Sequence, residues 1–320
     1  MLYPLKFQPI FKSRIWGGTK LHTQLGKAVP KGETIGESWE LSALAGNESV
    51  VANGTLAGKT INELMDIYKS ELLGKQVFKR FEGKFPLLFK FIDAADNLSI
   101  QVHPNDEIAE TKHNSSGKTE MWYIIDAEPE AKLYLGFTER ISSEYCADLV
   151  KNAALEQKLQ EYKVKAGDAF FIPAGLVHAL GKGILLAEIQ QSSDITYRLY
   201  DYNRRDSQGN FRELNVTDAL DAIDFENNFS PKINIKGEAL LCSNYFNVNK
   251  LSFLGEITRD YSDLDSFVVL MCVNGKVEIG DLKIAKGETM LIPAILANIT
   301  LKAKKKTEIL EVWVDKNIPK

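Results

Sequence analysis

The chain has 320 residues, 44% of them hydrophobic, which accommodates one large domain or two ordinary ones with a packed core. The formal net charge of −4 argues against nucleic acid or an anionic membrane surface as a binding partner. The N-terminal residues contain no apolar stretch of signal-peptide length, and no segment reaches the length of a membrane-spanning helix, so we expect neither export nor membrane insertion.

A short helical segment is predicted near residue 60. Thr60 and Glu63 form a capping-box pattern, and the apolar residues from Leu64 to Leu72 recur at helical spacing. Gly74 is a suitable residue for the end of this helix. We therefore expect a small helical excursion over about residues 60–81 in a chain that is otherwise rich in β-structure.

Most of the remaining chain consists of short runs rich in β-branched and aromatic residues, separated by Gly, Asn and Pro. This pattern is typical of a β-sandwich or a β-barrel. The predicted strands cover residues 86–91, 121–125, 132–135, 169–172, 184–190, 267–273 and 290–292.

Two further helical stretches and two connections complete the predicted elements. Residues 143–160 can form one or two helices, and residues 216–224 can form another. Residues 107–117 are predicted to form a loop, either a mobile flap or a plain connector, with His113 exposed on it. The polar segment 224–237 is typical of a connection between domains.

Four polar residues in or next to predicted strands are candidate metal ligands. Gln101 and His103 are two residues apart in an apolar run, so on a strand both side chains point to the same face. Glu120 begins another such run, and His178 follows the strand at 169–172. Two imidazoles, a carboxylate and an amide oxygen suit one divalent ion, most favourably Zn²⁺, with Mn, Fe, Co or Ni as alternatives. Each residue alone also fits an ordinary buried hydrogen bond or ion pair.

A ten-residue pattern occurs twice in the chain. Residues 165–174 (KAGDAFFIPA) are matched without a gap by residues 285–294 (AKGETMLIPA), and in this register His178 is aligned with Asn298. Two related β-barrels explain the repeat, although a common strand-entry pattern could also arise twice by chance. We predict a metal-binding catalytic domain over residues 1–230 and a second domain over residues 237–320 that lacks metal ligands.

Seven motifs along the chain form a recognisable set. They are Trp16-Gly17-Gly18, Gly36-Glu37-Ser38-Trp39, PLLFK at 86–90, LSIQVHP at 98–104, Lys118-Thr119-Glu120, PAGLVHA at 173–179, and Glu188, Asp194 and Arg198 at their spacing. As a set they resemble the type I mannose-6-phosphate isomerases of the cupin superfamily, in the short bacterial form. The resemblance implies a mainly β fold of two cupin-like jelly-roll barrels, and metal-dependent interconversion of mannose 6-phosphate and fructose 6-phosphate through an enediol.

The resemblance also implies a role for each matching residue. It implies metal ligation by Gln101, His103, Glu120 and His178, and catalytic roles for Arg198 and Lys118. Further residues match positions that line the substrate cavity, namely Lys90, Ser99, Glu188 and Asp194. Two positions differ from the pattern of longer relatives, which have Tyr where this chain has Leu180 and Lys where it has Arg204.

Aldose–ketose isomerisation moves a proton between two carbons of an open-chain sugar, so it needs a base and a group that stabilises negative charge on oxygen. Arg198 can stabilise that oxyanion, whereas Glu188, Asp194, Lys118 or a water on the metal can act as the base. No Gly-rich phosphate loop is present, so side chains must bind the phosphate. The candidates for this role are Lys90, Lys118, Arg198 and Arg204.

Two other functions fit the same residues. Two His and one carboxylate also bind Fe(II) in oxygenases, and a non-catalytic, metal-containing sugar-phosphate-binding cupin would need the same cavity. The added Gln and the cationic residues favour a phosphosugar enzyme over an oxygenase. We expect a small sugar phosphate as the partner and a monomer or weak homo-oligomer. The isolated Cys146, Cys242 and Cys272 indicate reduced thiols and a cytoplasmic location.

Overall fold

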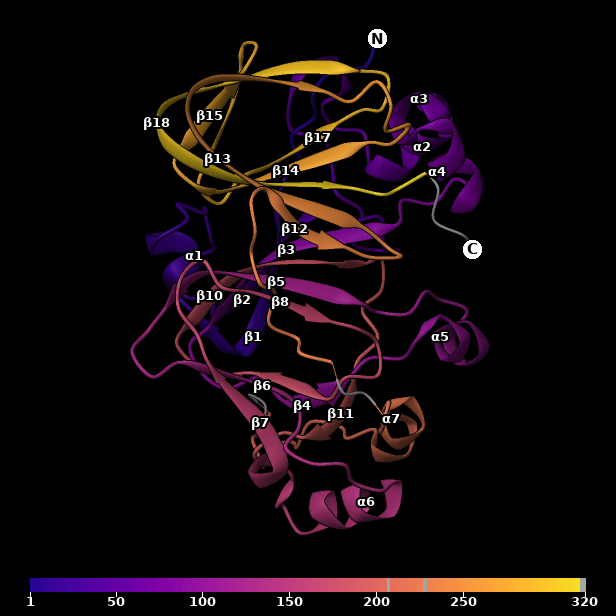
Figure 1. Ribbon diagram of the computed structural model, residues 1–320, viewed down its shortest axis with the longest axis vertical. Coiled ribbons are helices and arrows are strands. Elements are labelled where there is room, and N and C mark those ends of the chain that lie inside the picture. The colour runs from indigo at the N-terminus through magenta and orange to yellow at the C-terminus, as the bar shows by residue number, and fades with distance from the viewer. Residues whose placement is uncertain (206–207, 227–228, 317–320) are drawn as a thin grey trace.

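Three β-sheets are stacked along the long axis of the molecule (Figure 1). The C-terminal strands, in orange and yellow, form one end, and the helices α6 (Ser143–Lys151) and α7 (Val216–Ala222) lie at the other. This computed structural model describes residues 1–205, 208–226 and 229–316. The mainly β fold with few helices, predicted from the sequence, is confirmed.

Neighbouring strands within each sheet are antiparallel. The middle, 6-stranded sheet has the order β1 (Ile10–Gly18), β2 (Ile35–Leu41), β3 (Leu87–Ala94), β10 (Ile184–Gln191), β5 (Glu120–Ala127), β8 (Ala169–Ile172). The 5-stranded sheet has the order β11 (Tyr197–Tyr200), β4 (Ile100–Val102), β9 (His178–Leu180), β6 (Lys132–Phe137), β7 (Leu159–Lys163). The 7-stranded sheet contains β12 (Ala239–Cys242), β13 (Asn247–Asp260), β18 (Asn298–Trp313), β14 (Val268–Asn274) and β17 (Thr289–Ile292), with β15 (Lys276–Ile279) and β16 (Leu282–Ala285) beside them.

The helical excursion near residue 60 is confirmed, but it consists of three short helices. They are α2 (Ile61–Tyr68), α3 (Ser70–Leu73) and α4 (Lys75–Arg80). Both hydrogen bonds of the capping box between Thr60 and Glu63 are present. The first helix ends before Lys69, which has a φ of 46°, and Gly74 lies between the second and third helices rather than at the end of a single one.

The prediction of a loop over residues 107–117 is wrong for residues 107–113, whereas residues 114–117 do lie outside helices and strands. Residues Asp106–His113 form the helix α5, whose first turn is capped by the Asn105 side chain, which accepts a hydrogen bond from the N–H of Ile108. His113 is exposed at its last position, and its Nε2 lies 2.7 Å from the Tyr197 hydroxyl. Only Ala109 of this helix is fully buried, so the helix needs no apolar face. The sequence therefore shows no helical spacing of apolar residues here, and the helix could not be predicted from such spacing.

The other predicted helices are present as α6, α7 and the 3₁₀ helix Leu155–Lys158. The remaining short elements are the helix α1 (Lys20–Thr23) and a 3₁₀ turn at Gly54–Leu56. Within the described ranges, no helix has both the length and the apolar character needed to cross a membrane.

The two copies of the repeated sequence adopt the same local structure. Gly167 and Gly287 have φ values of 91° and 88°, and each turn leads into a strand that ends before a Pro. Such backbone angles favour glycine, which explains its presence in both copies. His178 then begins β9 inside the molecule, whereas Asn298 begins β18 in an exposed position.

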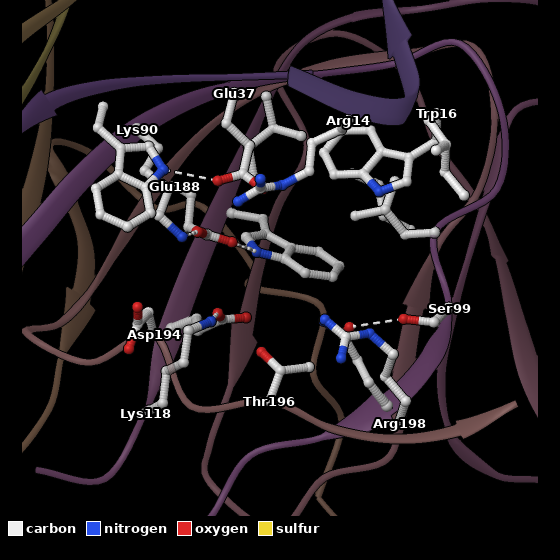
Figure 2. Close-up of a pocket in the computed structure, with 18 of the residues that line it drawn as sticks. Arg14, Trp16, Glu37, Lys90, Ser99, Lys118, Glu188, Asp194, Thr196 and Arg198 are labelled. Atoms are coloured by element: carbon white, nitrogen blue, oxygen red, sulfur yellow. Dashed lines mark hydrogen bonds and ion pairs between the residues drawn. The ribbon is translucent and has the colours of Figure 1, made fainter. Parts of the chain in front are cut away.

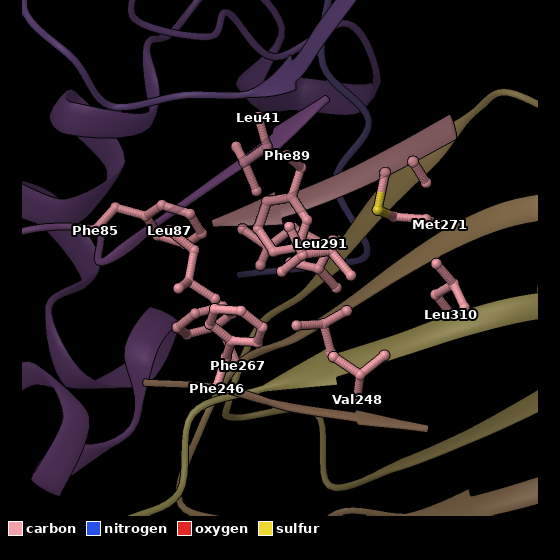
Figure 3. Close-up of a cluster of buried hydrophobic side chains, with 14 of the residues drawn as sticks. Leu41, Phe85, Leu87, Phe89, Phe246, Val248, Phe267, Met271, Leu291 and Leu310 are labelled. Atoms are coloured by element: carbon pink, nitrogen blue, oxygen red, sulfur yellow. The ribbon is translucent and has the colours of Figure 1, made fainter. Parts of the chain in front are cut away.

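The middle sheet is covered on both faces, and β3 is buried along its whole length. On one face, Leu87 and Phe89 pack with Phe246, Phe267 and other residues of the C-terminal strands (Figure 3). On the other face, alternate residues such as Ile92 point toward the 5-stranded sheet. The largest apolar cluster of the described chain therefore lies between the middle sheet and the C-terminal strands.

Segments from the first third of the chain also pack on the C-terminal strands. Leu5 forms a β-bridge with Leu291, with backbone N···O distances of 2.8 and 2.9 Å. The Asp265 carboxylate accepts hydrogen bonds from the N–H groups of Lys75 and Gln76, at the start of α4. In the predicted connection at 224–237, where residues 227–228 lie outside the described ranges, Lys232 forms a bridge with Phe170.

Replacing Phe267 with Ala should test this interface. Its ring is fully buried, with its centroid 4.8 Å from that of Phe85, so Phe267→Ala leaves a cavity and should lower the free energy of unfolding by about 3–5 kcal/mol. Urea denaturation measures the change. The control Leu254→Ala removes a side chain that is 67% exposed and should alter stability by less than about 0.5 kcal/mol. Equal effects of the two substitutions would contradict the assignment of this core.

Candidate metal centre and cavity

Strand register aligns polar side chains of the site in two rows. Across the middle sheet, paired positions carry Trp39, Lys90, Glu188 and Trp122. Across the 5-stranded sheet, paired positions carry Arg198, Gln101 and His178. Residues paired across antiparallel strands point to the same face, so each row forms part of one wall of the space between the sheets.

His103, Glu120 and His178 converge at one point between these rows. Nε2 of His103 lies 3.3 Å from Oε1 of Glu120, and Nε2 of His178 lies 3.9 Å from Oε2 of the same carboxylate. Candidate ligand atoms of the three residues all lie within 4.8 Å of one another, and each residue is at most 1% exposed. The fold thus brings together three residues that are distant in sequence.

The two imidazoles are held in the state that a metal requires. Nδ1 of His103 lies 2.9 Å from the carbonyl oxygen of Ile195, and Nδ1 of His178 lies 2.9 Å from that of Leu176. Each Nδ1 therefore carries the proton that it donates, and each Nε2 offers a lone pair toward Glu120. Burial, together with Lys118, lowers the pKa of His103 to about 3, and burial lowers that of His178, so both rings are neutral at neutral pH.

Glu120 supplies a buried negative charge. Burial alone would raise the pKa of its carboxyl, but the adjacent Lys118 holds that pKa well below its usual value. Oε1 contacts the Lys118 ammonium, whereas Oε2 has no hydrogen-bond partner among the described residues. A buried carboxylate oxygen without a partner is costly, and a cation bound between the two imidazoles would satisfy it.

Gln101 lies beside this cluster, as its pairing with His178 requires. Its Nε2 is 3.2 Å from Nε2 of His178, and its Oε1 accepts a hydrogen bond of 3.1 Å from the Ser99 hydroxyl. The amide is thus next to the two imidazoles. Exchanging its oxygen and nitrogen would direct the oxygen, a suitable ligand atom, toward them.

The cluster borders a cavity of about 410 Å³ between the two rows (Figure 2). Eight of the ten residues to which the family resemblance assigns a role line it, namely Lys90, Ser99, Gln101, Lys118, Glu120, Glu188, Asp194 and Arg198. The other two, His103 and His178, are buried beside it. Asp194 is exposed, so it belongs to the rim of the cavity.

Several lining residues were not predicted. Arg14, Glu37 and Arg212 contribute charged groups, and Thr196 contributes a hydroxyl. Arg14 and Glu37 could have been found, because each lies two residues before a cavity Trp on a strand. Arg212 lies outside helices and strands, where periodicity carries no signal. Arg204, proposed for the phosphate, is not among the lining residues and instead contacts Asp201.

Most charges of the cavity are paired. Lys90 lies 2.8 Å from Glu188, whose other oxygen accepts a hydrogen bond from Trp122 at 2.8 Å. Burial alone would lower the pKa of Lys90, but Glu188, Glu37 and Glu120 raise it, so this amine stays charged. Arg14 lies 2.7 Å from Glu37, whose pKa is lowered by Lys90 and Arg14 against the effect of burial.

The guanidinium groups of Arg198 and Arg212 are less fully matched by carboxylates than these pairs. The Arg198 Nε is buried without a hydrogen-bond partner among the described residues, and burial lowers the pKa of its guanidinium. Arg212 lies 3.4 Å from Asp201, but that carboxylate also binds Arg204. This part of the cavity therefore has excess positive charge and suits an anionic ligand.

Comparisons with known proteins agree with this geometry. The family model of the phosphomannose isomerase type I catalytic domain matches residues 4–142. The mannose-6-phosphate isomerase ManA of Bacillus subtilis is 37% identical over 309 residues, 93% of this chain and 95% of that relative. The probable mannose-6-phosphate isomerase GmuF of the same organism is 41% identical over 264 residues, 80% of this chain and 81% of that relative.

A crystal structure of the mannose 6-phosphate isomerase from Bacillus subtilis superimposes with a TM-score of 0.84 at 34% identity. The match covers 98% of this chain and 99% of that chain, so it includes all three sheets as well as the cavity.

Removing either histidine should remove the metal. His103→Ala or His178→Ala takes away one of the two imidazole donors, so we expect each variant to bind a divalent ion more than about 100-fold more weakly than the unaltered chain. Elemental analysis after dialysis measures the metal content. The matched control is Asn298→Ala at the equivalent position of the repeat, which should keep full metal content. Stoichiometric metal in both His variants would refute the site.

Proposed function

The chain belongs to the mannose-6-phosphate isomerase family, and we infer from this that it interconverts mannose 6-phosphate and fructose 6-phosphate. One observation supports this most directly. A buried cluster of two neutral imidazoles and a carboxylate borders a cavity that Arg198 also lines. The buried Nε of Arg198 has no hydrogen-bond partner among the described residues. Such a cavity combines a site for a divalent ion with a site for an anionic sugar.

We propose that His103, Glu120 and His178 hold one zinc ion, with Gln101 as the fourth protein ligand. Nitrogen and oxygen donors in this combination suit Zn²⁺, and the unpartnered Oε2 of Glu120 fits a bound cation. When bound, the ion would polarise the sugar carbonyl and orient the adjacent hydroxyl. The hydrogen bonds from both Nδ1 atoms to backbone carbonyls fix the rings for this purpose.

Lys118 and Arg198 are the residues that we propose to act on the reacting carbons. The Lys118 ammonium lies 3.1 Å from Nε2 of His103 and contacts Glu120, so it is beside the ligand cluster. Arg198 is paired with Gln101 across β11 and β4, so its guanidinium lies on the same wall. It can stabilise the oxygen that becomes negative as the enediol forms, and such a donor accelerates a reaction by about 10²–10³-fold.

Two side chains remain as candidates for the base. Both oxygens of Glu188 are engaged, one by Lys90 and one by Trp122, so we propose that Glu188 holds Lys90 in the cavity rather than accepting a proton from carbon. Asp194, and Lys118 once its ammonium has given up a proton, are then the side chains that can accept this proton.

We propose that the phosphate is bound by Arg14 and Arg212. Together with Arg198 these residues bring three guanidinium groups to the cavity, and burial and the neighbouring Arg14 lower the pKa of both Arg198 and Arg212. Guanidinium groups bind phosphate oxygens in a bidentate way, which favours them over Lys90, already paired with Glu188. Ser99, whose hydroxyl lies beside Gln101, is a further polar contact for the sugar.

The metal cluster also supports a division of the chain into two domains. We propose residues 1–230 as the catalytic domain and residues 237–320 as a second domain that supports it without binding metal. All three residues of the metal cluster come from the first range. The free cysteines Cys146, Cys242 and Cys272 fit a reducing cytoplasm, which we propose as the location.

Isomerase activity should require the metal and not oxygen. The metal-loaded chain should convert mannose 6-phosphate to fructose 6-phosphate, lose activity in a chelator, and regain it with Zn²⁺. An assay that couples fructose 6-phosphate formation to a dye measures this, with and without oxygen. A fully metallated chain without turnover would favour a binding protein, and turnover that needs oxygen would favour an oxygenase.

Removal of Arg212 should weaken substrate binding. If its guanidinium binds the phosphate, Arg212→Ala loses a charge-assisted hydrogen bond, and KM for mannose 6-phosphate should rise roughly 10- to 100-fold with a smaller change in kcat. The matched control is Arg204→Ala, since both residues bind Asp201 but Arg204 does not line the cavity. A larger increase in KM for Arg204→Ala would reverse the assignment.

A further inference from the structure

We propose that Tyr245, in the turn between the C-terminal strands β12 and β13, is a positioning residue for the metal centre. Through Asp106 it holds the backbone of residues 117–119, directly before the ligand Glu120 and around Lys118. This inference rests on the proposed function for its kinetic consequence, but its structural basis is independent of the reaction.

A continuous series of hydrogen bonds connects the two parts of the molecule. The Tyr245 hydroxyl donates to Oδ2 of Asp106 at 2.9 Å. Oδ1 of Asp106 accepts from the N–H of Gly117 at 2.8 Å and from Nε2 of Gln191 at 2.9 Å. Oε1 of Gln191 accepts from the N–H of Thr119 at 2.9 Å. Asp106 is thus connected to both sides of Lys118.

Three consecutive N–H groups are therefore held before β5 begins. Between the bonds of Gly117 and Thr119, the N–H of Lys118 donates to the carbonyl of Pro104 at 3.1 Å. The close approach needs glycine, because a Cβ at Gly117 would lie 2.7 Å from the backbone of Asn105 and Asp106. The direction of the Lys118 and Glu120 side chains depends on this backbone.

Tyr245 is itself firmly held. It lies in the turn between β12 and β13, where Oγ of Ser243 accepts from the N–H groups of Tyr245 and Phe246 at 3.3 and 3.2 Å. The next side chain, Phe246, is fully buried between the middle sheet and the C-terminal strands (Figure 3). Arg80 of α4 donates to the carbonyl of Asn244 at 2.9 Å.

Tyr245 keeps the proton that this contact requires. Burial and the neighbouring Asp106 raise the pKa of its hydroxyl to about 12, so it remains a donor at any physiological pH. The C-terminal strands, which contribute no residue to the metal cluster, would then contribute to the metal centre by orienting a strand that does. The role is mechanical, since Tyr245 does not line the cavity.

The test compares, in the zinc-loaded chain, two tyrosines that flank β13. Tyr245→Phe removes the hydrogen bond to Asp106, whereas the control Tyr261→Phe removes a hydrogen bond of 2.8 Å to Glu311, remote from the cavity. We expect Tyr245→Phe to release zinc to a chelator about three- to tenfold faster and to lower kcat by a similar factor with KM unchanged. Tyr261→Phe should change neither quantity.

A second variant separates this inference from a general loss of stability. Asp106→Asn should act in the same direction, and combining it with Tyr245→Phe should add little, because both interrupt one series of contacts. Unchanged zinc release in Tyr245→Phe, equal effects in Tyr261→Phe, or full additivity with Asp106→Asn would each overturn the proposal. Zinc release is measured without substrate, so it tests the role of Tyr245 even if the chain fails to isomerise mannose 6-phosphate.

Discussion

The site depends on the register of antiparallel strands. Gln101 faces His178 on one neighbouring strand and Arg198 on the other, while Lys90 faces Glu188 across the opposite wall. Side chains alternate between faces along a strand, so a slip of one residue would turn the ligand or the cation out of the cavity. The middle strands are resistant to such a slip because both of their faces are packed, and either face would lose its apolar contacts.

Charge is distributed unevenly along the cavity, and this gives the substrate an orientation. Near the ligand cluster, Lys118 is matched by Glu120 and Lys90 by Glu188. Around Arg212, by contrast, the guanidinium groups of Arg198, Arg204 and Arg14 outnumber the single neighbouring carboxylate, that of Asp201. A molecule with one anionic end and one polar, uncharged end would therefore be bound in one direction, with its anionic end away from the cluster.

The sequence was sufficient to predict the strands that consist of a buried apolar run, such as β3, β10 and β14, and to propose the candidate ligands. It did not predict the long strands β13 and β18, which have many exposed positions. Gln101 and His103 have the two-residue spacing of a strand, and the Gly and Pro around the second imidazole mark its turn. Arg212 and α5 were missed for the opposite reason. Arg212 comes to the cavity from an irregular segment, and α5 is polar on nearly all sides, so tertiary contacts alone place them. The packing of the C-terminal strands on the middle sheet could likewise not be predicted, because it joins residues from distant parts of the chain.

The double-sided burial of the middle sheet has a consequence for any attempt to divide the molecule. A fragment ending before residue 237 would retain every member of the metal cluster, yet Leu87, Phe89 and their neighbours would face water. A broad apolar sheet surface of that kind promotes self-association, so the fragment should aggregate rather than persist as a small enzyme. The C-terminal strands, which contain the second copy of the repeat and no member of the metal cluster, are thus required to cover the middle sheet.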